Sequence, residues 1–228
     1  MVDVQEPDTA STAVTLASSP LSATGIGQLL FQPSRYFSKP AFLGKTPELW
    51  LVAWLTGISY AIDRVDTYII RAELGARPGL GPWLSESWIN LWVFVLGFSV
   101  PSAFILFYLG GWWYRTRLEW SGVTTPDRDF ARQVYVYQDL VQSAPALILL
   151  AAQTFVFTNY SEARDAEEYW SSLVLVFVLW SCVASYKAAR SAFSADKWKA
   201  RLWFFILPLT LYVVVLGFLG TLYALLSE

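Results

Sequence analysis

Five stretches of mostly apolar residues constrain this chain more than any other feature. They are Leu49–Ile62, Trp88–Gly111, Leu140–Thr158, Trp170–Tyr186 and Trp203–Leu226. A helix of about 20 residues crosses the roughly 30 Å hydrocarbon core of a bilayer. The first and fourth stretches are shorter and need flanking residues to cross. Only 15% of the residues are charged, against about 25% in an average soluble domain. The sequence predicts an all-α polytopic membrane protein with a five-helix transmembrane bundle.

Prolines and tryptophans fit these spans. Pro101, Pro145 and Pro208 lie inside three of them, where neighbouring helices can satisfy the backbone groups that a proline frees. Indole rings collect at the headgroup level of membranes. The tryptophans near the predicted span ends are Trp50, Trp88, Trp112, Trp113, Trp170 and Trp203.

The amino-terminal part divides into two segments before the transmembrane domain at residues 49–226. Residues 1–25 are rich in Ser, Thr and Ala and lack Lys and Arg, which predicts a short disordered tail. Residues 26–48 carry an apolar stripe edged by bases, so we expect an interfacial segment anchored by Arg35, Tyr36 and Phe37. The alternative is a loop whose aromatic side chains pack on the helices.

The distribution of basic residues predicts the orientation in the membrane. With the amino terminus inside, 12 of the 16 Lys and Arg residues fall in cytoplasmic segments and 4 fall outside. Cytoplasmic segments carry the excess of Lys and Arg in membrane proteins. We therefore expect the amino terminus in the cytoplasm and the carboxyl terminus outside.

Residue counts exclude several chemistries. The chain has no histidine, one cysteine (Cys182) and a formal net charge of −2. These counts predict no site for a transition metal, no cofactor and no nucleic-acid partner. A phosphate-binding loop, a GxSxG motif and an HExxH motif are missing, and we expect a protein that is not an enzyme.

The third span carries the most informative polar residues. Asp139 opens it, and Gln142 and Ser143 follow one helical turn later, with Gln153 further along. Polar stripes in membrane helices face partners or cavities rather than lipid. The stripe could line a pore, a lipid headgroup pocket or a subunit contact. The alternative is an interhelical hydrogen bond that holds the bundle together.

Charged clusters near the spans give further candidates. We expect the first helix to end at Ile62 and the triplet Asp63, Arg64 and Asp66 to lie in water, although the run Val65–Ile70 could extend the helix. In the loop Tyr114–Tyr137, Arg115, Arg117, Arg128 and Arg132 could bind anionic lipid headgroups, although four nearby acidic residues dilute the attraction. The alternative, which we favour, is that this loop only determines the topology. The loop Lys187–Arg201 has a larger basic excess, and we expect it to face lipid through Lys197, Lys199 and Arg201.

The layout resembles the Yip family, the Ypt/Rab-GTPase-interacting membrane proteins, in its bacterial form. The resemblance is carried by Phe31–Pro40, by Gly110-Gly111, by the polar run Phe130–Pro145 and by Pro208. It implies a membrane-organising or trafficking-like role in the bacterial cytoplasmic membrane, with a eukaryotic endomembrane as the alternative.

Two functions are compatible with these features. The first is a non-enzymatic accessory or scaffold subunit that binds membrane lipids and other membrane protein subunits. The second is a small transporter or channel component that uses the stripe at Asp139 and Gln142. Transport would be favoured by a second polar helix facing the third span, and the sequence shows no other span with a comparable stripe.

Overall fold

The computed structural model describes residues 20–38, 47–73, 75, 79–166 and 170–226 of the 228. Within these ranges the structure contains helices and no strand, which confirms the all-α class. Most of the predicted disordered tail lies outside the described residues. α1 (Ala23–Phe31) begins two residues before the predicted end of the tail, where the Ser22 side chain accepts a hydrogen bond from the amide of Gly25 at 3.1 Å.

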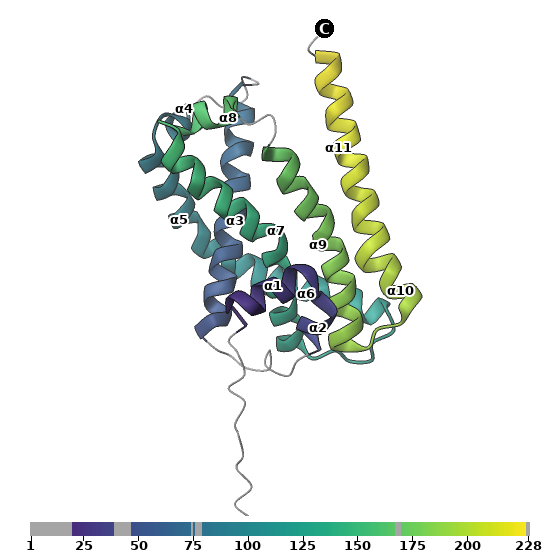
Figure 1. Ribbon diagram of the computed structural model, residues 1–228. Coiled ribbons are helices and arrows are strands. Elements are labelled where there is room, and N and C mark those ends of the chain that lie inside the picture. The colour runs from purple at the N-terminus through teal and green to yellow at the C-terminus, as the bar shows by residue number, and fades with distance from the viewer. Residues whose placement is uncertain (1–19, 39–46, 74, 76–78, 167–169, 227–228) are drawn as a thin grey trace, which may run out of the picture.

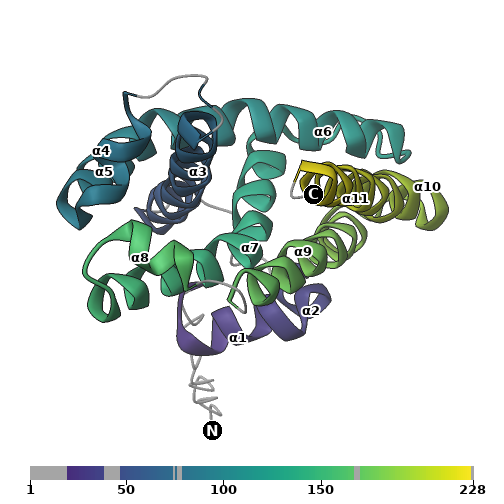
Figure 2. The same ribbon diagram turned by 90° about the horizontal axis from the view of Figure 1, so that it is seen from above.

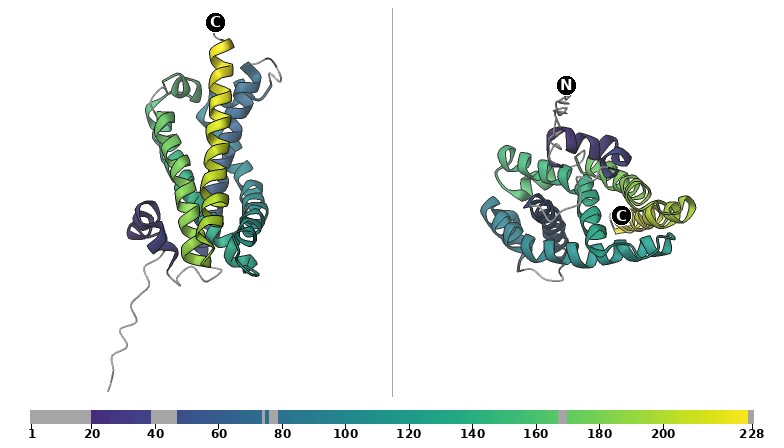
Figure 3. Two further views of the ribbon diagram at one scale, coloured as in Figure 1. Left: turned by 90° about the vertical axis from the view of Figure 1, so that its right-hand side faces the viewer. Right: turned by 90° about the horizontal axis from the view of Figure 1, so that it is seen from below.

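Long helical segments run alongside one another in alternating directions (Figure 1). Short helices lie at the two ends: α4 and α8 at one end, and α1, α2, α6 and α10 near the other (Figure 1). Figure 3 shows α1 and α2 against one side of the bundle. The remaining bounds are α2 (Pro33–Phe37), α3 (Pro47–Glu73), α4 (Gly81–Glu86), α5 (Trp88–Ile105), η2 (Leu106–Gly110), α6 (Gly111–Trp120), α7 (Arg128–Val156), α8 (Tyr160–Asp165), α9 (Trp170–Phe193), α10 (Lys197–Arg201), η3 (Leu202–Ile206) and α11 (Leu207–Leu226).

Four segments of the described chain are long and apolar enough to cross a membrane. They are Trp88–Trp120, Arg128–Val156, Val174–Phe193 and Lys197–Val215. These segments indicate an integral membrane protein. The helix α3 is not among the four, because its length includes Asp63, Arg64 and Asp66.

Several helices extend well beyond the predicted spans. α3 does not end at Ile62 but continues to Glu73, so that prediction was wrong. The second span continues past Gly111 to Trp120, and α7 begins at Arg128 rather than near Leu140. The loop predicted at Tyr114–Tyr137 is therefore largely helical. A helix keeps its backbone hydrogen bonds through polar residues, whereas hydropathy marks only the apolar part of its length.

Close helix contacts depend on glycine at two places. A Cβ atom on Gly57 of α3 would lie 2.4 Å from the carbonyl oxygen of Ser99 on α5. At Gly110 and Gly111, a Cβ atom would meet the side chains of Tyr135 and Arg132 on α7 at 2.3 and 2.4 Å. Only glycine allows backbones to approach this closely.

Indole hydrogen bonds join the helices within the described chain. Trp54 of α3 donates to the Ser99 hydroxyl at 2.8 Å, and Trp92 of α5 donates to Thr154 of α7 at 3.1 Å. Trp180 of α9 donates to the Leu30 carbonyl of α1 at 2.7 Å. Part of the large aromatic content therefore fixes neighbouring helices to one another.

The interfacial anchor needs a correction. Tyr36 and Phe37 are buried, with 2% and 3% of their surfaces exposed, and the Tyr36 ring lies 6.3 Å from that of Tyr137 on α7. Their side chains pack in the protein core, so they do not contact lipid as expected. Arg35 remains exposed on α2. The alternative prediction was that aromatic side chains of this segment pack on the helices. It holds for Tyr36 and Phe37, although these residues lie on a helix rather than on a loop.

Candidate binding site inside the helix bundle

The polar stripe of α7 is buried and bonded to a neighbouring helix. Asp139 is 9% exposed, and its carboxylate accepts hydrogen bonds from the Gln142 amide at 2.7 Å and the Ser143 hydroxyl at 3.5 Å. The Ser181 hydroxyl of α9 lies 3.2 Å from the Gln142 carbonyl oxygen and 2.7 Å from the Val178 carbonyl of its own helix, so its one proton is shared between the two acceptors. Asp139 thus orients Gln142, and Gln142 makes the link between helices. Asp139 lies inside α7 rather than at its start, because the helix begins at Arg128.

A second polar face, on α3, looks toward this stripe. Thr56, Ser59, Tyr60, Asp63 and Asp66 stand at positions i, i+3, i+4, i+7 and i+10, which places them on one side of the helix. All five line the same cavity as Asp139, Gln142 and Ser143. The structure therefore reveals the second polar helix facing the third span, which was not recognised from the sequence.

The cavity between these two faces measures about 530 Å³. Val174 and Val178 of α9 and Tyr212 of α11 complete its wall, together with Leu106, Tyr135, Ile62 and Ala146. This volume falls within the roughly 300–1,000 Å³ of ligand pockets in proteins.

The cavity lining is acidic. Asp63, Asp66 and Asp139 line it, and no Lys or Arg is among its described lining residues. Asp63 pairs with the neighbouring Arg64 at 3.2 Å, and Asp66 accepts a hydrogen bond from the Tyr160 hydroxyl at 2.6 Å. The Asp63 side chain is 68% exposed, so Asp139 is the buried carboxylate of the three. Its charge acts more strongly on an occupant than a charge in water does. The arrangement therefore favours a positively charged occupant.

The carboxylates do not converge on one point. Among the described residues, no group of three His, Cys, Asp or Glu side chains is arranged to hold a metal ion. The geometry suits a solute that spreads its contacts around the cavity better than a tightly coordinated metal.

A smaller cavity of about 330 Å³ adjoins the first one. It shares Tyr135, Asp139, Gln142 and Tyr212 with the larger cavity and lies among α6, α7, α9 and α11. Figure 2 shows these four helices grouped around one region of the bundle. The polar interior thus extends from the α3 side of Asp139 to the α6 side.

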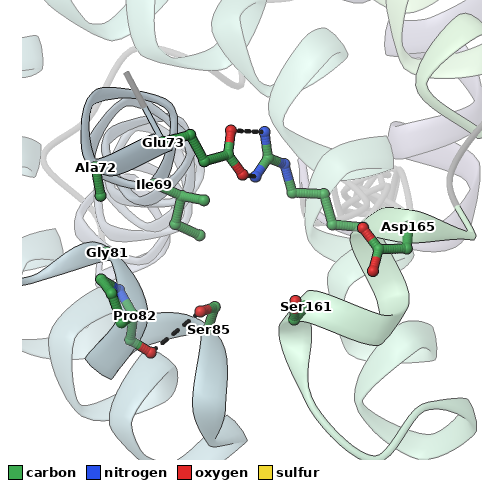
Figure 4. Close-up of a pocket in the computed structure, with 9 residues that line it drawn as sticks. Ile69, Ala72, Glu73, Gly81, Pro82, Ser85, Ser161 and Asp165 are labelled. Carbon is green, nitrogen blue, oxygen red and sulfur yellow. Dashed lines mark hydrogen bonds and ion pairs between the residues drawn. The ribbon is translucent and has the colours of Figure 1, made fainter. Parts of the chain in front are cut away.

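A third cavity lies at the end of the bundle where α4 and α8 meet α3 (Figure 4). Arg164 of α8 binds Glu73 of α3 through both carboxylate oxygens, the longer contact being 3.1 Å. The hydrogen bonds from Arg164 lower the pKa of Glu73 below its ordinary value of 4.5. Because these two charges form an ion pair with each other, we interpret this region as a structural clamp, the Arg164–Glu73 ion pair that holds α8 against α3.

The other predicted contact residues lie away from the cavity. Lys197, Lys199 and Arg201 are exposed on α10, and their contact with lipid stays a prediction. The sequence reasoning missed the polar face of α3 and the burial of Arg117. The regular spacing from Thr56 to Asp66 was the available signal for the first, whereas Arg117 gave none.

Comparisons with protein-family models, curated proteins and solved structures gave no match. The resemblance to the Yip family stays a prediction. The function is therefore inferred from the geometry of the site.

Proposed function

We propose that this chain is a non-enzymatic integral membrane protein that binds a small organic cation inside its helix bundle, as a small transporter or channel component. The observation that carries this proposal is the pair of polar faces on α3 and α7. These faces surround one cavity with Asp63, Asp66 and Asp139. Ionisable residues are costly inside membranes and are retained where they face a cavity or a functional path.

The proposal includes α3 as the fifth membrane span. The helix has 27 residues, or about 40 Å at 1.5 Å per residue, which is enough to cross the hydrocarbon core. Its charged groups have partners: Asp63 pairs with Arg64, whose guanidinium lies 4.6 Å from the centre of the Tyr60 ring, and Asp66 bonds to Tyr160. These contacts reduce the cost of keeping the charges at membrane depth.

The proposed orientation has the amino terminus in the cytoplasm. The basic-rich segments α6 and α10 lie at one end of the bundle, and α4 and α8 lie at the other (Figure 1). A bacterial cytoplasmic membrane is the proposed location. A reporter that is active only in the cytoplasm, fused after Glu228, should give no signal, and a strong signal would reverse the orientation.

A scaffold or accessory subunit is the second candidate. The helix α11 supports it, because the helix stands apart from much of the bundle (Figure 1). Its apolar side chains between Leu207 and Val215 are largely exposed. Leu211, Val213 and Val214 are about 60% exposed. A second membrane protein could pack on this face, as the resemblance to the Yip family implies.

One substitution separates these functions. Asp139→Leu removes the carboxylate that both cavities share. Under the transport proposal, uptake of methylammonium into liposomes falls while assembly with co-purifying proteins holds. Monomer stability then falls by no more than the roughly 0.6–2 kcal/mol of an interhelical polar contact. A scaffold would instead lose assembly. Ile148→Leu, on the exposed side of the same helix, is the matched control and should change none of the three.

Other outcomes reject both functions. A loss of about 0.6–2 kcal/mol in monomer stability with flux and assembly intact would leave Asp139 as a bundle contact only. Wild-type liposomes that take up methylammonium no faster than protein-free liposomes would contradict the transport proposal directly.

A further inference from the structure

Arg117 is a buried cation without an anion in the part of the chain that the structure describes. It is 8% exposed on α6, and its guanidinium lies 4.6 Å from the centre of the Phe204 ring and 5.5 Å from that of Tyr114. Its Nε atom is fully buried and makes no hydrogen bond. Aromatic rings attract a cation but do not replace a hydrogen-bond acceptor. A buried, uncompensated charge is strongly unfavourable, so the site is incomplete as it stands.

Two further polar groups with unused hydrogen-bonding capacity lie on the same cavity. Gln138 of α7 and Ser185 of α9 are buried, and their Oε1 and Oγ atoms have no partner among the described residues. Both line the cavity of about 330 Å³ together with Arg117. The volume is roughly ten times the 30 Å³ that one water molecule occupies in the liquid, so it holds more than a single bridging water. Three helices thus present unpaired polar groups to one space.

The cavity also has an apolar opening toward the outside of the bundle. Trp113, Leu207 and Leu211 line it, and they are 40%, 42% and 60% exposed. Trp120 and Trp203 pack nearby with their ring centres 4.4 Å apart. Paired indoles next to a basic residue are typical of the headgroup level, and basic pockets between helices on the cytoplasmic side bind lipid headgroups.

We propose that this cavity binds the phosphate oxyanion of an anionic phospholipid, with Arg117 and Ser185 as donors. The unpaired Oε1 atom of Gln138 is an acceptor, so it would take a hydroxyl of the headgroup rather than the phosphate. The acyl chains would leave between Trp113 and Leu211. The carboxylate on the lining, that of Asp139, already accepts hydrogen bonds from Gln142 and Ser143. This inference does not depend on the proposed cation transport, because it uses side chains that do not line the larger cavity.

The full chain in nanodiscs tests the proposal. Discs of phosphatidylcholine are compared with discs that also contain phosphatidylglycerol, and lipids retained after extraction into a neutral detergent are counted by native mass spectrometry. Wild-type protein should retain phosphatidylglycerol, and Arg117→Gln should retain it roughly tenfold less, as expected for a lost charge-assisted hydrogen bond. Arg115→Gln is the matched control, since Arg115 lies on the same helix and pairs with Glu119 at 3.2 Å. It should retain as much as the wild type.

A second measurement identifies the source of the anion, and a second variant serves if the first does not fold. Inorganic phosphate, added to protein in phosphatidylcholine discs, should raise the thermal midpoint less than phosphatidylglycerol does if the occupant is a lipid. A larger effect of inorganic phosphate would assign the same oxyanion site to a soluble anion. If Arg117→Gln does not fold, Ser185→Ala replaces it, because that hydroxyl has no partner to lose, and it should weaken retention several-fold. Equal retention by the folded variant and the wild type, without stabilisation by either anion, would overturn the proposal.

Discussion

At the scale of single residues, the interior of the bundle depends on short chains of polar contacts. Asp139 holds Gln142, and Gln142 accepts from Ser181 on α9. The sequence predicted the part of this polar network that lies on α7, because polar residues stand out within an apolar run. It could not predict Ser181 as the partner, because serines also occur on faces where they bond only to their own helix. The sequence offered Arg117 as one of four possible headgroup-binding arginines, but it could not predict the burial of Arg117, which depends on Phe204, far away in the sequence.

The Ser181→Ala variant tests the interhelical contact. We expect the free energy of unfolding to fall by about 0.6 kcal/mol, the mean for interhelical polar contacts in membranes. Reversible unfolding in mixed micelles measures it. Ser161→Ala, at an exposed position of α8, should unfold with the free energy of the wild type, because it removes no contact between helices. Equal stabilities of the two variants would show that the Ser181 contact contributes nothing.

At the scale of helices, hydropathy predicted the existence and order of the long segments better than their ends. The polar parts of α3 and α7 continue as helix because Asp63–Asp66 and Arg128–Asp139 contain no proline or glycine to stop them. We interpreted the charged triplet as the end of a helix, and this hid the polar face of α3. Only the packing of α3 against α7 shows that its carboxylates share a cavity with Asp139.

The contact between α3 and α5 gives a prediction at this scale. In Gly57→Ala the new methyl group would lie 2.4 Å from the Ser99 carbonyl oxygen. The helices must separate, which should cost about 1–3 kcal/mol of unfolding free energy. Gly97→Ala on α5 is the control, since its Cβ atom would meet nothing within 4 Å. If both variants unfold at the same denaturant concentration, the close approach of the two helices is wrong.

The clamp between α3 and α8 should depend on pH. Its hydrogen bonds place the pKa of Glu73 below the ordinary value of 4.5. The stabilisation is therefore complete above about pH 4.5 and is lost as the pH falls through the lowered pKa. Backbone hydrogen exchange of Tyr160–Asp165, corrected for the intrinsic effect of pH, should accelerate in this acidic range.

Two variants control this measurement. Glu73→Gln should exchange fast in α8 already at neutral pH and change little on acidification, because its ion pair is absent throughout. Glu86→Gln, at an exposed position of α4, should behave like the wild type. A wild-type α8 that exchanges equally slowly on both sides of the transition would contradict the clamp.

At the scale of the whole molecule, the chain combines apolar membrane helices with a polar interior. The outward residues of α5 and α11 are apolar and exposed, whereas the facing sides of α3 and α7 hold carboxylates, hydroxyls and amides around a cavity. This distribution distinguishes the protein from a helix bundle whose interior is packed only with apolar side chains. Asp63 and Asp66 of α3 and the polar stripe of α7, which are separate features in the sequence, line one acidic cavity.

Cysteine accessibility tests this acidic cavity most directly. With Cys182→Ser as background, Ser59→Cys places a thiol on the cavity wall, and Val93→Cys places one on the outer surface of α5, where the valine is 63% exposed. Proteoliposomes are treated with a cationic and with an anionic methanethiosulfonate reagent. Ser59→Cys should react, and should react several-fold faster with the cationic reagent, because the lining is acidic. Val93→Cys should stay unreactive in lipid. A Ser59→Cys variant that reacts no faster than Val93→Cys, or equally fast with both reagents, would contradict the acidic cavity and the function proposed from it.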